Sequence, residues 1–169
     1  MHKSITARSS FILMIDMQEK LLPAVFNKDE VIKNSVRILT AAHELSVPMI
    51  VTEQYPQGIG ATIPELKNLI TDDTEIMDKV EFSCCAAKKF GDAFLNLSFN
   101  SGTKDTAILF GVETHICVLA TAIDLIEKYN YYNVPSMFIE DEKIYEAHRG
   151  ESFDECKENV RRVLEAAVS

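Results

Sequence analysis

The sequence predicts an α/β protein in which parallel strands alternate with helices. Apolar runs recur at intervals of roughly thirty residues, a spacing typical of strand–helix–strand units. The runs that we interpret as strands are Phe11–Ile15, Pro48–Val51, Thr74–Met77, Thr106–Phe110 and Val134–Ile139. Patterns of helical period separate them. Helices between sequential strands imply a parallel sheet that is covered on both faces.

The segments between these strands carry the helical patterns. Residues 29–46 and 86–98 each place apolar side chains on one helical face, and a third apolar stripe follows Cys117. Thr62-x-x-Glu65 and Ser152-x-x-Glu155 match the capping box that opens a helix. The polar segment 140–150 is the longest loop that we expect.

Length and composition are those of an ordinary globular domain. The chain has 169 residues, of which 47% are hydrophobic and 25% are charged, so we expect one domain over residues 1–169. No apolar run approaches the ~20 residues that span a bilayer. The first ten residues lack the apolar segment of a secretory signal, so we expect a cytoplasmic protein, with a short mitochondrial presequence as the alternative.

Net charge and cysteine spacing limit the kinds of binding partner and cofactor that we expect. The net charge of −9 disfavours nucleic acid and anionic membranes and leaves a small molecule as the expected partner. The cysteines show no zinc-site spacing, and the sequence has no phosphate-binding or dinucleotide-binding glycine motif. We therefore expect free thiols, no metal and no cofactor. The four cysteines are Cys84, Cys85, Cys117 and Cys156.

Cys117 is the residue whose position most suggests chemistry. It lies where the strand Thr106–Phe110 gives way to a helix, so it faces the edge of the sheet at which α/β proteins bind ligands. The N-terminus of the helix should stabilise a thiolate there. The alternative is that Cys117 packs as a small buried hydrophobe, as most free cysteines do.

Two further ionisable residues follow strand ends. Asp16 ends the first strand and Lys79 lies just after the third, so both should meet Cys117 at one edge of the sheet. A carboxylate can accept the proton of a thiol, and an ammonium can hold that carboxylate ionised. The alternatives are a helix cap for Asp16 and a solvated surface position for Lys79. If Lys79 supports the chemistry, Lys79→Ala should lower kcat strongly and leave the melting temperature within a few degrees of the wild type.

Four segments together resemble a known family, the isochorismatase-like cysteine hydrolase superfamily. They are Ile15–Leu21, Val51–Leu66, Lys79–Ser83 and Gly111–Leu125. Within the second, Thr-Glu-Gln-Tyr-Pro is most similar to the eukaryotic isochorismatase domain-containing proteins. The resemblance extends over roughly residues 11–141, which is most of the chain.

The resemblance implies a catalytic triad of Asp16, Lys79 and Cys117. In such enzymes the cysteine attacks the carbonyl carbon of an amide, the aspartate takes and returns the proton, and the lysine keeps the pair in register. The backbone N–H groups of Glu113 and Cys117 would form the oxyanion hole, beside a cis peptide bond between Val112 and Glu113. The side chains that we expect around the substrate are those of Gln18, Gln54, Tyr55 and Phe82.

The resemblance also implies a complete fold and an assembly. The fold is a doubly wound three-layer α/β/α sandwich with a parallel sheet of five or six strands in the order 3-2-1-4-5. Members commonly assemble, so we expect a homo-oligomer, a dimer or larger. The segment after the second strand has neither the Asp nor the His ligands of metal-binding relatives, and Ile139–Lys143 departs from the family pattern.

We therefore expect cysteine-dependent hydrolysis of a small amide-like C–N bond through a thioester. One alternative is a catalytically idle member of the fold that serves as a binding or scaffolding protein. The other is a true isochorismatase that acts on a vinyl ether, for which the sequence offers no basic clamp to hold a dicarboxylate.

Overall fold

The structure is a computed structural model that describes residues 5–72, 74–101, 104, 106–129, 136–139 and 142–146. The chain divides into two compact units, Met1–Tyr131 and Tyr132–Ser169. The first unit holds the sheet and its helices, and we describe each unit by itself. None of the described helices has the length and apolarity that a membrane span requires.

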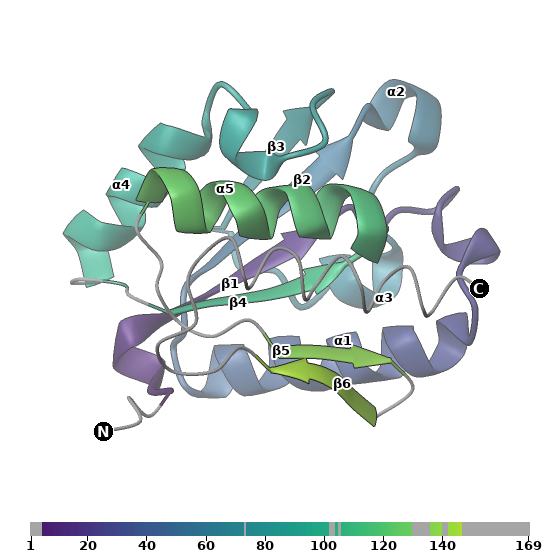
Figure 1. Cartoon of the computed structure of the whole chain (residues 1–169), viewed down its shortest axis with the longest axis horizontal. Helices are drawn as coiled ribbons and strands as arrows, with labels where there is room; N and C mark the ends of the chain where they lie inside the picture. The colour runs from purple at the N-terminus through teal and green to yellow at the C-terminus, as the bar shows by residue number, and fades with distance from the viewer. Residues whose placement is uncertain are drawn as a thin grey trace. The chain divides into compact units, whose positions relative to one another are not determined.

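The first unit is built on a four-stranded parallel sheet in the order β3-β2-β1-β4 (Figure 1). The strands are β1 (Ser10–Ile15), β2 (Met49–Gln54), β3 (Glu75–Lys79) and β4 (Thr106–Gly111). The parallel sheet and the order of its first four strands are confirmed. The register brings the carboxyl ends of all four strands to one edge, because Ile15 pairs with both Thr52 and Gly111 and Gln54 pairs with Lys79.

Helices and short turns connect these strands. The helices are α1 (Lys28–Glu44), α2 (Pro56–Ile59), α3 (Pro64–Lys67), α4 (Phe90–Ser101) and α5 (Leu119–Tyr129). Turns of 3-10 helix occupy Ala7–Ser9, Leu22–Ala24 and Cys84–Ala86, and a π-helical turn, Thr114–Val118, precedes α5.

The capping box expected at Thr62 is wrong. Helix α3 starts with Ile63 as its cap and Pro64 in the first turn, and it has no side-chain cap. The hydroxyl of Thr62 donates instead to the buried Glu53 carboxylate, at 2.8 Å.

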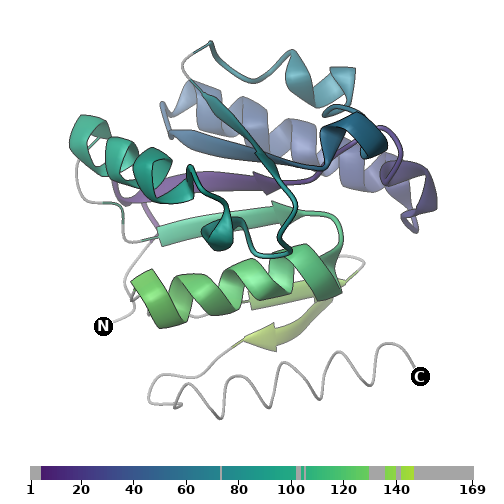
Figure 2. The same cartoon turned by 90° about the horizontal axis from the view of Figure 1, so that it is seen from above.

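Two apolar clusters pack against opposite faces of the sheet. The side chains of β1 alternate between them and are all buried. Phe11, Leu13 and Ile15 pack with Phe90 of α4 and Leu125 of α5. Ile12 and Met14 pack in the other cluster, which includes residues of α1 and α3. Helices therefore cover both faces, with α1 on one side and α5 on the other (Figure 2).

The second unit contains an antiparallel strand pair. Strand β5 (Ser136–Ile139) pairs with β6 (Glu142–Glu146), and Ile139 lies opposite Glu142. A strand was predicted at residues 134–139, and it is present at 136–139. The fifth parallel strand is not confirmed, because β5 pairs with β6 and the sheet of the first unit has four strands in the described residues.

The loop expected over residues 140–150 is wrong for 142–146, where Ile144 and Tyr145 favour a strand. Antiparallel strands can be joined by a short hairpin, whereas parallel strands need a long crossover. The helix expected from Ser152, and Cys156 with it, lie outside the described residues.

Candidate functional site

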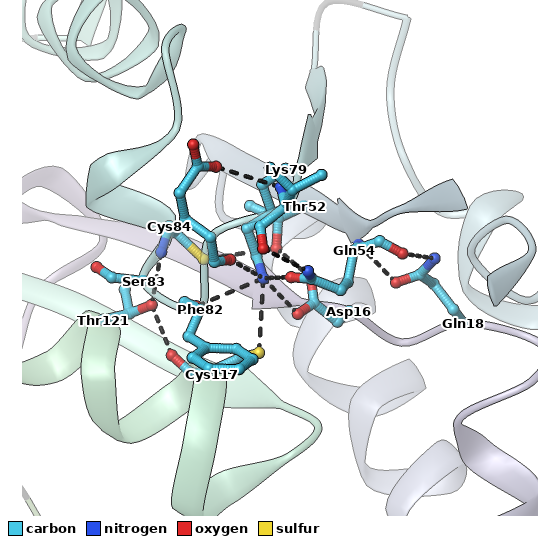
Figure 3. Close-up of polar contacts among 12 residues, drawn as sticks. Asp16, Gln18, Thr52, Gln54, Lys79, Phe82, Ser83, Cys84, Cys117 and Thr121 are labelled. Carbon is cyan, nitrogen blue, oxygen red and sulfur yellow. Dashed lines mark hydrogen bonds and ion pairs between the residues drawn. The ribbon is translucent and has the colours of Figure 1, made fainter. Parts of the chain in front are cut away.

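The carboxyl edge of the sheet brings together the three residues predicted to carry the chemistry. Asp16 follows β1, Lys79 ends β3, and Cys117 lies in the π-helical turn after β4. The Lys79 ammonium donates to Asp16 Oδ2 at 2.7 Å and to Cys117 Sγ at 3.6 Å (Figure 3). One nitrogen therefore links a carboxylate and a thiol that lie about a hundred residues apart in the sequence.

The backbone of β1 and β4 approaches closely at this edge, and Gly111 permits it. Gly111 has φ +148°, and a Cβ there would lie 2.0 Å from the Ile15 carbonyl oxygen. Only glycine fits such a contact. Asp16 also has a positive φ, +54°, and its N–H donates to the Thr52 carbonyl at 3.1 Å. The peptide bond between Val112 and Glu113 is cis, as predicted.

Asp16 is fully buried, and both of its carboxylate oxygens accept hydrogen bonds. The Thr52 hydroxyl donates to Oδ1 at 2.8 Å, while the Lys79 ammonium occupies Oδ2. The carboxylate caps no helix, since Leu21 is the cap of the next helical turn and carries no side-chain cap bond. The helix-cap alternative for Asp16 is therefore wrong.

Lys79 is also buried, with 3% of its surface exposed. Besides Asp16 and Cys117, its ammonium donates to Gln54 Oε1 at 2.6 Å and to the carbonyl oxygens of Glu81 and Phe82 at 3.2 and 3.5 Å. The surface-lysine alternative is therefore wrong. A buried ammonium with these partners is part of both the fold and the site.

Cys117 is buried, and its surroundings together raise its pKa to about 11, which favours the neutral thiol. Burial is the largest cause, and the negative charge of Asp16 acts in the same direction. Lys79 acts in the opposite direction and does not prevail. Lys79 favours the thiolate and Asp16 opposes it, as expected, but burial and Asp16 together outweigh the stabilisation by Lys79. Any base that makes Cys117 a nucleophile at neutral pH must take the proton as the sulfur attacks.

The other described cysteines are shifted in the same direction. Burial raises the pKa of Cys84, and it raises the pKa of Cys85 to about 12. All three thiols are unpaired. Cys117 therefore differs from the other two in its contact with Lys79 and in its position beside Asp16, and not in its ionisation.

A hydrogen-bond chain that the sequence did not predict fixes the Cys117 turn. The Thr121 hydroxyl donates to the Cys117 carbonyl at 2.7 Å and accepts from the Cys84 N–H at 2.9 Å. The Ser83 hydroxyl donates to Asp124 Oδ2 at 2.6 Å, one helical turn further on. These bonds tie the segment after β3 to α5. Thr121 sits four residues after Cys117, a spacing at which a threonine can bond back to a helix carbonyl.

The two glutamines predicted to line the substrate site hold its framework together. The buried Gln18 amide donates to the carbonyls of Gln54 and Gly60 at 3.0 and 2.6 Å and accepts from the Gln54 N–H at 2.7 Å. Gln54 binds Lys79 through its oxygen and donates to the Val80 carbonyl at 2.9 Å. Both amides are thus occupied by the protein itself.

The remaining predicted side chains, Tyr55 and Phe82, are exposed and follow the ends of β2 and β3.

In the part of the chain that the structure describes, the Glu113 N–H donates to no acceptor, and the Glu113 carbonyl accepts from Ile116 and Val118 at 3.2 and 3.3 Å. The N–H groups of Ile116 and Val118, on either side of Cys117 in the sequence, are therefore occupied. The first turn of a helix leaves N–H groups without helical partners, so this turn can bind an anionic oxygen.

Within the described ranges, no group of three His, Cys, Asp or Glu residues is arranged to hold a metal ion. The carboxylate of Glu53, on β2, is bonded within the protein, because it accepts from the N–H and the hydroxyl of Thr62. The absence of a metal stays a prediction.

Comparison with known proteins identifies relatives of this chain. The model of the isochorismatase domain matches residues 10–134. The chain belongs to the isochorismatase family. It is 34% identical over 124 residues to isochorismatase domain-containing protein 2 of Danio rerio, a match that covers 73% of this chain and 59% of the relative. The chain thus spans about three fifths of that relative's length.

Several solved structures are similar to this chain in both sequence and fold. A structure of MAR1 ribonuclease from Caenorhabditis elegans is 32% identical, with a TM-score of 0.71 over 97% of this chain and 77% of that one. YcaC of Escherichia coli, an octameric hydrolase of unknown specificity, is 25% identical, with a TM-score of 0.65 over 73% and 60%. YcaC of Pseudomonas aeruginosa with hexane-2,5-diol and covalent acrylamide is 26% identical, with a TM-score of 0.66 over 76% and 63%.

Proposed function

We propose that this member of the family is a cysteine hydrolase that cleaves a small amide-like C–N bond. Cys117 is the nucleophile, Asp16 is the general acid and base, and Lys79 holds the two in register. The observation that carries the proposal is the single buried Lys79 ammonium that contacts both Asp16 Oδ2 and Cys117 Sγ.

The first half-reaction follows from the neutral state of the thiol. Cys117 Sγ forms a bond to the carbonyl carbon while its proton passes to Asp16, so no free thiolate has to form. The carbonyl oxygen becomes an oxyanion, which the N–H groups of Glu113 and Cys117 stabilise. The C–N bond then breaks, and the proton on Asp16 passes to the departing nitrogen, which leaves as ammonia or an amine.

The second half-reaction regenerates the enzyme. Water attacks the Cys117 thioester and gives its proton to Asp16. The C–S bond breaks, the carboxylic acid leaves, and the proton returns to the sulfur. Lys79 stays protonated throughout and stabilises the Asp16 carboxylate whenever it is charged.

Two of the related structures support parts of this proposal. Acrylamide is an amide that reacts with thiols, and the Pseudomonas aeruginosa YcaC carries it covalently. The Escherichia coli YcaC is an octameric hydrolase. We extend both to this chain and propose a homo-oligomer, a dimer or larger. A complete three-layer sandwich with a fifth parallel strand stays a prediction.

RNA is not the substrate that we propose, although the Caenorhabditis elegans relative is named a ribonuclease. A net charge of −9 repels the phosphate backbone that dominates affinity for nucleic acids. We also propose no membrane partner, since an acidic chain is repelled by anionic lipids in the same way.

A binding or scaffolding protein without turnover is the second candidate. The raised pKa of Cys117 favours it, because a neutral thiol is a weak nucleophile. The two candidates differ in what Asp16 does. In a hydrolase it takes the thiol proton during attack, whereas in an idle protein it only pairs with Lys79.

A screen of small amides with ammonia release as the readout tests the proposal. We expect at least one amide to be hydrolysed, and we expect Cys117→Ala and Asp16→Asn to abolish the release. Cys85→Ala is the matched control, because Cys85 is also a free thiol, but it is only partly buried and its sulfur donates to the Thr121 carbonyl, at 4.0 Å. Release that persists in Cys117→Ala would exclude the mechanism.

A further inference from the structure

Three exposed apolar residues lie in the short segments that follow β2 and β3, whose ends are neighbours in the sheet. Tyr55 is 53% exposed, Val80 69% and Phe82 62%. Single exposed apolar residues are normal on a protein surface, but a group at one place often marks a binding site. We call Tyr55, Val80 and Phe82 the apolar rim.

The apolar rim is built onto the catalytic framework by its backbone. The Tyr55 N–H donates to the Lys79 carbonyl at 2.8 Å, and the Gln54 amide donates to the Val80 carbonyl at 2.9 Å. The Phe82 carbonyl accepts from the Lys79 ammonium at 3.5 Å. These bonds use only the backbone of the three residues, so the exposed parts of the side chains can contact a ligand; one face of the Tyr55 ring lies against Gly58 of α2.

The Phe82 ring is directed toward the reactive sulfur. In Figure 3 it points from the segment after β3 toward Cys117. Both residues also contact the same Lys79 nitrogen, Phe82 through its carbonyl and Cys117 through its sulfur. Of the three rim residues, Phe82 is therefore the one that we expect nearest to a substrate bound at Cys117.

The charges around the site disfavour an anion. The positive charge of Lys79 is neutralised by Asp16 at 2.7 Å, and among the described residues no other cation is bonded to Asp16 or Cys117. Glu81, between two residues of the apolar rim, and Glu113 are both exposed.

Glu81 keeps its negative charge at neutral pH. Hydrogen bonds from its own N–H and from that of Val80 lower its pKa. Lys79 and the exposed Lys88 also lower the pKa of Glu81, and the effect of Lys88 is the smaller of the two. A substrate carboxylate would therefore meet a negative charge on the apolar rim and no cation built to bind it.

We infer that this site selects an uncharged amide that carries an apolar group, and that the apolar rim binds that group. The inference rests on the function proposed above and deepens it by naming the substrate class. It disfavours dicarboxylates, which need a cation that is not already paired.

Thiol reagents of different charge test the inference without any need for turnover. The probes are iodoacetamide, which is uncharged, iodoacetate, which is anionic, and N-phenyl iodoacetamide, which is uncharged and aromatic. The rate at Cys117 is measured by peptide mass spectrometry and divided by the rate of 2-mercaptoethanol with the same reagent. This ratio removes the intrinsic reactivity of each probe.

We expect the normalised rate of the aromatic probe to exceed that of iodoacetamide by about tenfold, the effect of covering part of one aromatic side chain. We expect iodoacetate to be slower than iodoacetamide by about the same factor, because one uncompensated charge opposes it. Phe82→Ala should remove most of the preference for the aromatic probe. The variant keeps the backbone carbonyl that binds Lys79, so the site remains intact.

Leu95→Ala is the matched control, because Leu95 is an equally exposed apolar residue, 54% exposed, on α4. It should keep the wild-type preference. Iodoacetate as fast as iodoacetamide, or an aromatic preference that survives Phe82→Ala, overturns the inference and leaves the proposed hydrolase standing. A Cys117 that none of the three probes labels overturns both.

Discussion

Replacing Lys79 with methionine should destabilise the protein strongly. In the wild type the side chains of Lys79 and Asp16 are both fully buried and lie 2.7 Å apart. Lys79→Met removes the ammonium and keeps the length of the side chain, so the Asp16 carboxylate stays buried with the Thr52 hydroxyl as its remaining side-chain donor. Breaking a buried ion pair from one side costs about 3–5 kcal/mol.

The corresponding shift in melting temperature is large enough to measure. For a domain of this size, 1 kcal/mol corresponds to roughly 2–4 °C, so Lys79→Met should melt about 6–20 °C below the wild type. This replaces the sequence-based expectation of a few degrees, which assumed that Lys79 supports the chemistry alone. Calorimetry at neutral pH measures the shift directly.

Two controls separate the buried pair from a general effect of losing a lysine. Lys33→Met removes an exposed lysine that pairs with Glu30 at 3.1 Å, and it should change the stability by no more than about 1 kcal/mol. The double variant Asp16→Asn/Lys79→Met removes both charges of this pair and should recover most of the lost stability. If Lys79→Met melts within about 2 °C of the wild type, the pair contributes nothing measurable and the reasoning is refuted.

Three further predictions follow from the same geometry. Because the pKa of Cys117 is raised to about 11, its alkylation by iodoacetamide should rise about tenfold per pH unit above neutral pH and level off near that value; a plateau reached by about pH 8 would contradict the assignment. Thr52→Val removes a donor to a buried carboxylate and should lower amide turnover by at least about tenfold, and Thr52→Ser should restore it; equal rates in the two variants would show that the hydroxyl has no role. Gly111→Ala should prevent folding or destabilise by more than about 3 kcal/mol, whereas Gly91→Ala, where a Cβ meets nothing within 4 Å, should be neutral or stabilising; a well-folded Gly111→Ala would show that the close approach can relax.

The parallel strands and the meeting of Asp16, Lys79 and Cys117 could be predicted from the sequence. Apolar runs at a regular spacing mark parallel strands, and the residues that follow such strands meet at one edge. The family resemblance added the order of strands 1 to 4 and the cis bond before Glu113. These features depend on local residue patterns and on the order of strands and helices, both of which can be inferred from the sequence.

What the sequence could not supply depends on contacts in space. The pKa of Cys117 is set by burial and by two charges of opposite sign, and their balance cannot be derived from spacing. Gln18 was predicted to line the substrate site, and that role stays a prediction; the hydrogen bonds of its amide to residues 36 and 42 positions away along the chain could not be predicted from the sequence. Ser136–Ile139 forms a strand as predicted, yet an apolar run alone does not identify its pairing partner.

In the proposed mechanism Cys117 forms a covalent thioester during hydrolysis. Once the amide screen has identified a substrate, acid quenching during turnover followed by peptide mass spectrometry detects this intermediate. We predict that the peptide containing Cys117 gains the mass of the acyl group, that the peptides of Cys84 and Cys85 do not, and that Asp16→Asn forms no adduct. Steady turnover with no acyl group on Cys117, or an acyl group on another cysteine, would contradict the account.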